Sequence, residues 1–123
     1  MAVKYVGAKK IQQAFNKRQL YSRLLAGELQ ASIRDDNHLN RARAANLRMP
    51  HCTCSQMVAY LEQGQLVTIV HQYLQPDGTL GGSGQPDPKW LRVGQDIWKY
   101  RPASRRSRKR SQKRQSTTNL SCC

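Results

Sequence analysis

Residues 66–74, LVTIVHQYL, are the stretch that decides the fold. The stretch is dense in β-branched and aromatic residues, and its apolar side chains fall on both alternating faces of an extended chain. Both faces of such a strand are normally covered, because a strand with one solvated face alternates apolar with polar residues. We therefore predict a buried strand at the centre of a sheet.

The chain that leaves this strand is rich in turn residues. Gln75-Pro76-Asp77-Gly78 predicts a reversal, since proline presets the first central position of a turn and glycine accepts a positive φ. Thr79-Leu80 then pairs back briefly, and the glycines between 81 and 84 form a loop. A phosphate-binding loop normally has a Lys-Ser or Lys-Thr pair and a following helix, so residues 76–88, which lack them, are interpreted as a connector.

A terminal hairpin is predicted after this loop. Residues 90–93 (WLRV) and 96–100 (DIWKY) have the composition of two strands, and Gly94-Gln95 between them suits a two-residue turn. Asp87-Pro88 is interpreted as the start of one helical turn that carries Trp90.

The first half of the chain favours helices. Between Lys9 and Leu25 apolar residues recur three or four positions apart, with an interruption at Arg18, and Gly27 is suited to end that helix. Residues 29–34 then alternate apolar with polar side chains, which predicts a short strand.

Two capping signals predict further helices. Asp35-Asp36-Asn37 is a turn and capping cluster ahead of a basic helix over residues 38–48, which ends before Pro50. Thr53 and Gln56 have the spacing of a capping box, which predicts a short helix to Glu62 with Gly64 as its stop.

Together these elements predict a small α+β domain over residues 1–100, with N-terminal helices followed by three or four mostly antiparallel strands between Leu66 and Tyr100. Residues 101–123 are dominated by Arg, Lys and Ser. Such a segment cannot bury enough apolar surface to offset the entropy of ordering it. We predict that it forms a disordered basic tail.

The formal net charge of +14 is unevenly distributed. Residues 1–48 contain ten basic and three acidic residues, residues 49–100 three and four, and residues 101–123 eight and none. A positive field of this size attracts polyanions, with nucleic acid (DNA or RNA) first and an acidic membrane surface or acidic protein as the alternative partner. The side chains expected to contact phosphates are Arg41, Arg43 and Arg48 in the predicted helix and Arg105, Arg106, Arg108, Lys109, Arg110, Lys113 and Arg114 in the tail.

His71 is the leading candidate for a catalytic residue. It lies on the predicted central strand, on the same face as Val67, Ile69 and Tyr73. In a small toxin-like endoribonuclease, His71 would act as general acid or base beside Tyr73, while Lys89 steadies the developing charge on the phosphate. A single histidine among apolar neighbours is more often a hydrogen-bonded structural residue. The leading prediction is therefore a non-enzymatic, largely sequence-nonspecific nucleic-acid-binding protein, and the ribonuclease is the alternative.

The sequence predicts neither a cofactor nor a metal. His51-Cys52-Thr53-Cys54 offers ligands to zinc, but C-x-C is not the spacing of zinc ribbons and a second knuckle is missing. Cys122-Cys123 resembles the double-cysteine prenylation signal of small vesicle-trafficking GTPases, without their phosphate loop. With no apolar run long enough to span a bilayer and no secretory signal, we expect a cytoplasmic protein with reduced cysteines, or a nuclear one in a eukaryote.

Residues 71–89, HQYLQPDGTLGGSGQPDPK, resemble a segment of uncharacterised small phage and prophage proteins. The resemblance covers residues 66–100 and carries no known activity with it. It implies a phage or bacterial origin.

Overall fold

The computed structural model describes residues 1–101 of the 123-residue chain. The helices are α1 (Ala8–Lys17), α2 (Leu20–Leu25) and α3 (Arg41–Asn46), and the strands are β1 (Val3–Val6), β2 (Gln30–His38), β3 (Cys54–Glu62), β4 (Gln65–Leu74), β5 (Asp87–Val93) and β6 (Asp96–Tyr100). Within the described residues, the three helices and one six-stranded mixed sheet confirm the predicted α+β class. The predicted order of helices first and strands afterwards is corrected, because β1 and β2 are interleaved with the helices.

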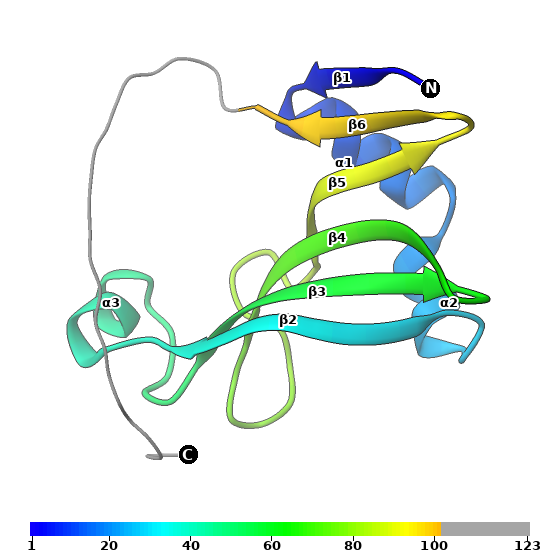
Figure 1. Ribbon diagram of the computed structural model, residues 1–123. Coiled ribbons are helices and arrows are strands. Elements are labelled where there is room, and N and C mark those ends of the chain that lie inside the picture. Colours follow the sequence, from blue (N-terminus) through cyan, green and yellow to red (C-terminus); the bar gives the residue numbers. More distant parts are fainter. Residues whose placement is uncertain (102–123) are drawn as a thin grey trace.

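The sheet has the strand order β1-β6-β5-β4-β3-β2 (Figure 1). Strands β2 to β6 pair antiparallel with their neighbours in sequence, whereas β1 pairs with β6 in parallel. The stretch 66–74 falls in β4, which lies inside the sheet between β3 and β5, as predicted.

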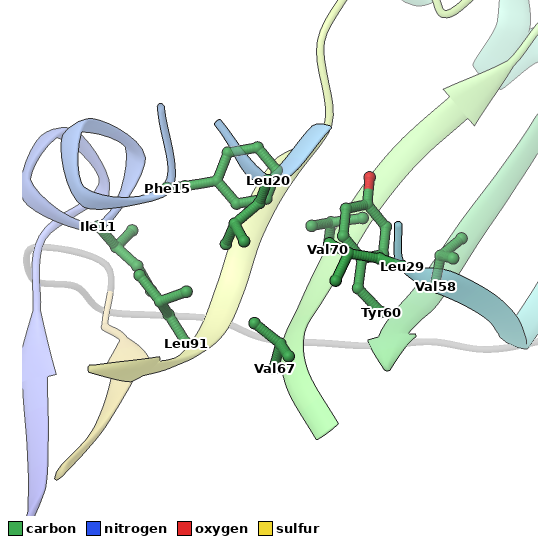
Figure 2. Packing of buried hydrophobic residues seen from close by; sticks show 9 residues of the cluster. All are labelled: Ile11, Phe15, Leu20, Leu29, Val58, Tyr60, Val67, Val70 and Leu91. Atoms are coloured by element: carbon green, nitrogen blue, oxygen red, sulfur yellow. The ribbon is translucent and has the colours of Figure 1, made fainter. Parts of the chain in front are cut away.

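The hydrophobic core lies between the sheet and helices α1 and α2, which cover one face of the sheet (Figure 1). Figure 2 shows side chains from the helices and from the sheet meeting in this layer. The buried cluster comprises Ile11, Phe15, Leu20, Leu29, Val58, Tyr60, Val67, Val70 and Leu91. The Tyr60 hydroxyl has no hydrogen-bond partner within residues 1–101, and burial raises the pKa of Tyr60 well above its usual value. Tyr60 therefore serves this layer as a packing residue, in ring contact with Phe15.

The region from Cys54 to Glu62 is strand β3 and not the predicted short helix. Thr53 caps no helix, because its hydroxyl donates to a backbone carbonyl of the preceding turn at 2.7 Å. Gln56 lies on β3, where its side-chain amide exchanges hydrogen bonds with side chains of both neighbouring strands. Pairing on two sides outweighs the local capping pattern, since strand alternation carries Val58 and Tyr60 together into the core.

The Asp35-Asp36-Asn37 cluster also differs from its prediction, because it continues strand β2. β2 is an edge strand of the sheet, where charged side chains remain solvated and discourage pairing with another chain. Helix α3 begins later, at an N-cap formed by Asn40, whose Oδ1 accepts from the backbone N–H of Arg43 at 2.8 Å.

The hairpin between β3 and β4 is a two-residue turn. Gln63 and Gly64 have φ values of 51° and 81°, and positive φ at both central positions is the requirement of a type I′ turn. Gly64, predicted to stop a helix, thus closes a hairpin.

The loop between β4 and β5 is held by its own hydrogen bonds and by packing. The Gly78 amide donates to the Gln75 carbonyl at 2.9 Å, and Leu80 bridges back to Leu74, as predicted. At Gly81 an added Cβ would lie 3.1 Å from the Cε of Met49, so the loop packs closely against the chain that follows α3.

Asp87 and Pro88 begin strand β5 and not the predicted helical turn. Proline cannot donate a ladder hydrogen bond, and Pro88 lies at a register shift between β4 and β5, where the regular ladder is interrupted. The terminal hairpin is confirmed, with Val93 paired to Asp96 around Gly94, whose φ is 62°.

The predicted helix over residues 9–25 is divided into α1 and α2. The division falls at Arg18 and Gln19, and Gln19 has a φ of 54°, outside the helical range. Gly27, with a φ of 85°, follows the end of α2 as predicted. Strand β1 was not predicted, because VKYV is short and exposed and is ordered by pairing with the distant β6.

Candidate nucleic-acid interface

The sheet has a second face, opposite α1 and α2, which we call the open face. In Figure 1 the sheet is seen with α1 and α2 behind it, so this face is towards the viewer. Register partners and strand alternation assign to it Val3, Tyr5, Ser32, Asp35, Asn37, Ser55, Met57, Ala59, Ile69, His71, Tyr73, Asp87, Trp90, Arg92, Ile97 and Lys99. Val3 is 49% exposed and Tyr5 is 54% exposed, and Trp90 and Lys99 are half-buried.

One row of side chains on the open face crosses all six strands. It runs through the register partners Ser32, Ala59, Ile69, Trp90, Lys99 and Tyr5. Lys99 is the partner of Trp90 on one side and of Tyr5 on the other. The row contains no acidic residue, so nothing within it neutralises Lys99.

An arginine guanidinium group lies over each of the two aromatic rings of this row. The Cζ of Arg101 lies 4.3 Å from the ring centre of Tyr5, and the Cζ of Arg92 lies 5.6 Å from that of Trp90. Arg92 is oriented by its Nε, which donates to the Leu66 carbonyl at 3.1 Å. Cations and π-systems therefore alternate along β5, β6 and β1.

A second group of open-face side chains surrounds His71. The Oγ of Ser55 and the Nε2 of His71 are 2.8 Å apart, and the Tyr73 ring meets the imidazole edge-on with ring centres 4.7 Å apart. The predicted common face is right for Ile69 and Tyr73 but wrong for Val67. A register shift between β3 and β4 turns Val67 into the core.

Lys89, the third predicted catalytic residue, is engaged on its own strand. Its Nζ lies 2.8 Å from the Asp87 carboxylate and 4.2 Å from the ring centre of Tyr100. Asp87 is the register partner of His71, so the ion pair lies beside the imidazole. The structure thus brings Ser55 and Tyr73 to His71, while Lys89 is held by other groups.

The pKa of His71 is lowered below its ordinary value of 6.5. The largest cause is burial, which disfavours the charged imidazolium; the positive charge of Lys89 lowers the pKa further, Asp87 opposes this, and Arg43 adds a smaller lowering. His71 is therefore neutral at pH 7 and exchanges a hydrogen bond with Ser55 in that form.

The predicted phosphate contacts on α3 are exposed. Arg41 and Arg43 lie on the helix, Arg48 follows it with a φ of 56°, and all three side chains face solvent. The positive charge of Arg43 contributes to the lowered pKa of His71. Contact between these arginines and phosphate stays a prediction.

Several predictions fall on residues outside the described part of the chain. These are the tail cations Arg105, Arg106, Arg108, Lys109, Arg110, Lys113 and Arg114, and the terminal Cys122 and Cys123. Within residues 1–101, no helix is long and apolar enough to cross a membrane. The same residues contain no group of three or more His, Cys, Asp or Glu side chains placed to hold a metal ion.

Comparison with protein-family models, with curated proteins and with solved structures finds no match to this chain. The class that the fold defines is an α+β domain whose six-stranded mixed sheet is covered by helices on one face and carries aromatic and basic side chains on the other. The function is therefore inferred from the chemistry of the open face.

Sequence reasoning identified His71 and Tyr73 but missed the row formed by Trp90, Lys99 and Tyr5. The predicted terminal hairpin already contained a usable signal, because closing it at Gly94-Gln95 aligns Trp90 with Lys99. Tyr5 joins the row only through the parallel pairing of β1 with β6, which links opposite ends of the described chain and leaves no local pattern.

Proposed function

We propose that this protein binds nucleic acid without catalysing a reaction and largely without reading its sequence. The observation that supports the proposal is the open-face row. In this row Lys99 lies between Tyr5 and Trp90, and an arginine guanidinium lies over each of these two rings. Basic side chains neutralise phosphates, and aromatic rings stack on bases of any identity. Both kinds of contact tolerate any sequence.

The charge balance supports the same class of partner. The chain has 21 basic and seven acidic residues, and the carboxylates of Glu28, Glu62, Asp87 and Asp96 are already engaged in salt bridges. The basic excess therefore stays available to a polyanion, which releases its condensed counterions when its phosphates are neutralised. Acidic lipid or an acidic protein responds to the same charge but offers no base to the rings of Tyr5 and Trp90.

A ribonuclease centred on His71 stays the alternative prediction. The Nε2 of His71 is engaged by Ser55, and the Lys89 ammonium is paired with Asp87, so neither group is aimed at a shared reaction centre. These contacts are typical of a structural histidine, and they favour binding over catalysis.

The proposal predicts binding that weakens steeply with salt. For the full chain and labelled oligonucleotides, the logarithm of affinity should fall linearly with the logarithm of salt concentration, by about 0.7 to 0.9 for each phosphate neutralised. Replacing the seven tail cations, from Arg105 to Arg114, with glutamine should lower both the affinity and the slope. Fluorescence anisotropy over a salt series measures both.

A matched control keeps the charge while changing the side chains. A variant in which the five tail arginines of this set, Arg105, Arg106, Arg108, Arg110 and Arg114, become lysine should retain the wild-type slope, because counterion release depends on charge. Affinity that is insensitive to salt contradicts the proposal. Affinity that survives the glutamine replacement intact contradicts the tail as the main phosphate contact. If the protein binds vesicles of acidic lipid more tightly than any oligonucleotide, its partner is an acidic membrane surface and not nucleic acid.

A further inference from the structure

The open face differs from an ordinary solvated sheet face in what it exposes. Tyr5, Trp90 and Tyr73 are three aromatic side chains on one face, of which Tyr5 is exposed and the other two are half-buried. The basic Arg92 and Lys99 and the acidic Asp87 lie on the same face. A solvated face that serves only to keep a protein in solution is normally polar, since exposed aromatic area is unfavourable in water. The arrangement points to a ligand that is both flat and negatively charged.

We infer that the open face is a stacking platform for the bases of an unpaired nucleic-acid strand, with Tyr5 and Trp90 as the base-contacting rings and Lys99 as the phosphate contact between them. This inference rests on the proposed function and names its substrate class. It gives the domain a task separate from that of the basic segment after residue 100.

The spacing of the two rings favours an unpaired strand. Tyr5 and Trp90 lie on β1 and β5, with β6 between them, and neighbouring strands are about 4.8 Å apart, so the rings are separated by about 10 Å. Successive bases in a duplex strand are only about 3.4 Å apart and stacked on each other. A base inside a duplex has both faces covered by these neighbours, so it cannot also stack on a protein ring. Two bases that stack on Tyr5 and Trp90 must therefore belong to an unpaired strand whose own stacking is broken.

The shape of the face excludes insertion into a duplex groove. Six strands at a spacing of about 4.8 Å give a face about 24 Å wide, whereas the major groove of DNA is about 12 Å wide. A duplex can therefore meet this face only through its phosphates. An unpaired strand can offer phosphates and base faces together, which is what the alternation of Lys99 with the two rings requires.

The guanidinium groups extend the platform. Arg92 and Arg101 lie over the rings of Trp90 and Tyr5, and an arginine plane stacks on bases as an aromatic ring does. If a base displaces the guanidinium from its ring, the guanidinium can reach a phosphate. If a base instead stacks on the guanidinium, the positive charge stays between the ring and the base. Each ring thus couples one stacking contact to one positive charge.

The test compares single-stranded and duplex oligonucleotides of the same sequence, as DNA and as RNA, with the full chain at a fixed salt concentration. Tyr5→Leu and Trp90→Leu should each weaken binding of the single strands about tenfold and leave duplex binding nearly unchanged. Tyr100→Leu is the matched control, because Tyr100 also lies beneath a cation but pairs with Val6, which packs against the core on the helix-covered face. It should bind single strands as the wild type does. Stacking uses the base, so tight binding of either sugar type supports the inference.

A spectroscopic measurement gives direct contact information without changing the face. The chain has two tryptophans, and Trp98 packs against the core beneath Lys10, so a Trp98→Phe variant reports on Trp90 alone. Single-stranded oligonucleotide should quench this fluorescence to saturation, and duplex should not. If Trp90→Leu fails to fold, as circular dichroism would reveal, this quenching together with Tyr5→Leu at the exposed edge strand still decides the question.

The failure of this inference is distinguishable from that of the proposed function. Salt-dependent binding that is equal for single strands and duplex, with no quenching and no effect of Tyr5→Leu, overturns the stacking platform and leaves nucleic-acid binding in place. No binding to any oligonucleotide overturns both. A concentration-dependent dimer in sedimentation velocity that Tyr5→Leu dissociates shows that a second copy covers this face, which also overturns the platform.

Discussion

His71 shows how the environment of one side chain sets its response to pH. Its folded pKa lies below 6.5 chiefly because of burial, and the charges of Lys89 and Arg43 act in the same direction. An unfolded histidine titrates near 6.5, so between the two pKa values the unfolded chain binds more protons than the folded chain. Acidification through this range therefore favours unfolding.

We expect the free energy of unfolding to decrease as the pH falls from about 7.5 to about 5.5. The His71→Gln variant should show a smaller decrease than the wild type over the same range, because it lacks the contribution of His71. Urea denaturation at several pH values measures the difference. His38→Gln is the matched control for replacing one histidine by glutamine, because His38 is exposed on the edge strand β2. Hydrogen bonds from Thr79 lower the pKa of Asp77 below its ordinary value of 3.8. The stability that Asp77 contributes is therefore lost only below about pH 3.8, so it does not affect the measurement between about pH 5.5 and about pH 7.5. Identical pH profiles for wild type and His71→Gln would contradict the assignment.

The elements that the sequence predicted well are those whose composition matches their surroundings. Residues 66–74 form β4 inside the sheet as predicted, but only one of its faces packs on the core. The other face, with Ile69, His71 and Tyr73 half-buried, lies on the open face and not under the predicted cover. Residues 54–62 show the opposite case, since Thr53 and Gln56 imitate a helix start and pairing with β2 and β4 overrides them. Capping signals are local and weak, whereas a strand with partners on both sides gains from every pair along its length.

The same distinction separates the predictable from the unpredictable parts of the site. His71 and Tyr73 lie on a strand with a clear pattern, so their common face followed from alternation alone. The place of Tyr5 depends on the parallel partner of β1, and parallel pairings are made across long sequence separations that short windows of sequence do not report. Val67 was misplaced because a bulge shifts alternation by one residue, and nothing in LVTIVHQYL marks the bulge.

The β3–β4 hairpin offers a test of how much one turn contributes. Gly64 has a φ of 81°, and no other atoms lie within 4 Å of the position that an added Cβ would take. The cost of Gly64→Ala is therefore conformational and free of steric clash, and we expect the free energy of unfolding to fall by about 1 kcal/mol. Gly64→Asn is the matched control, because asparagine also adds a Cβ but tolerates a positive φ better than alanine does, so it should cost less than Gly64→Ala. Equal losses for the two variants in urea denaturation would rule out the positive φ as the cause.

Over the whole molecule, the charge that attracts a polyanion also works against the compact state. The net charge is +14, and α1 adds to the local repulsion because its first turn contains Lys9 and Lys10 but no acidic residue at the positive end of the helix dipole. Salt screens both effects, since the Debye length falls from about 30 Å at 0.01 M to about 10 Å at 0.1 M. Screening should therefore stabilise the fold while it weakens binding to nucleic acid.

We accordingly expect Tm to rise as NaCl increases from about 0.01 M to about 0.2 M, over the range in which affinity for oligonucleotides falls. Lys9→Glu lowers the net charge by two and places a carboxylate at the start of α1, so its Tm at low salt should exceed that of the wild type by about 3 °C and rise less with added NaCl. Lys9→Gln, which only removes the charge, should lie between the two. Thermal unfolding followed by circular dichroism measures all three proteins. A Tm that is independent of NaCl in the wild type, or a Lys9→Glu variant less stable than the wild type at low salt, would show that self-repulsion does not limit this fold.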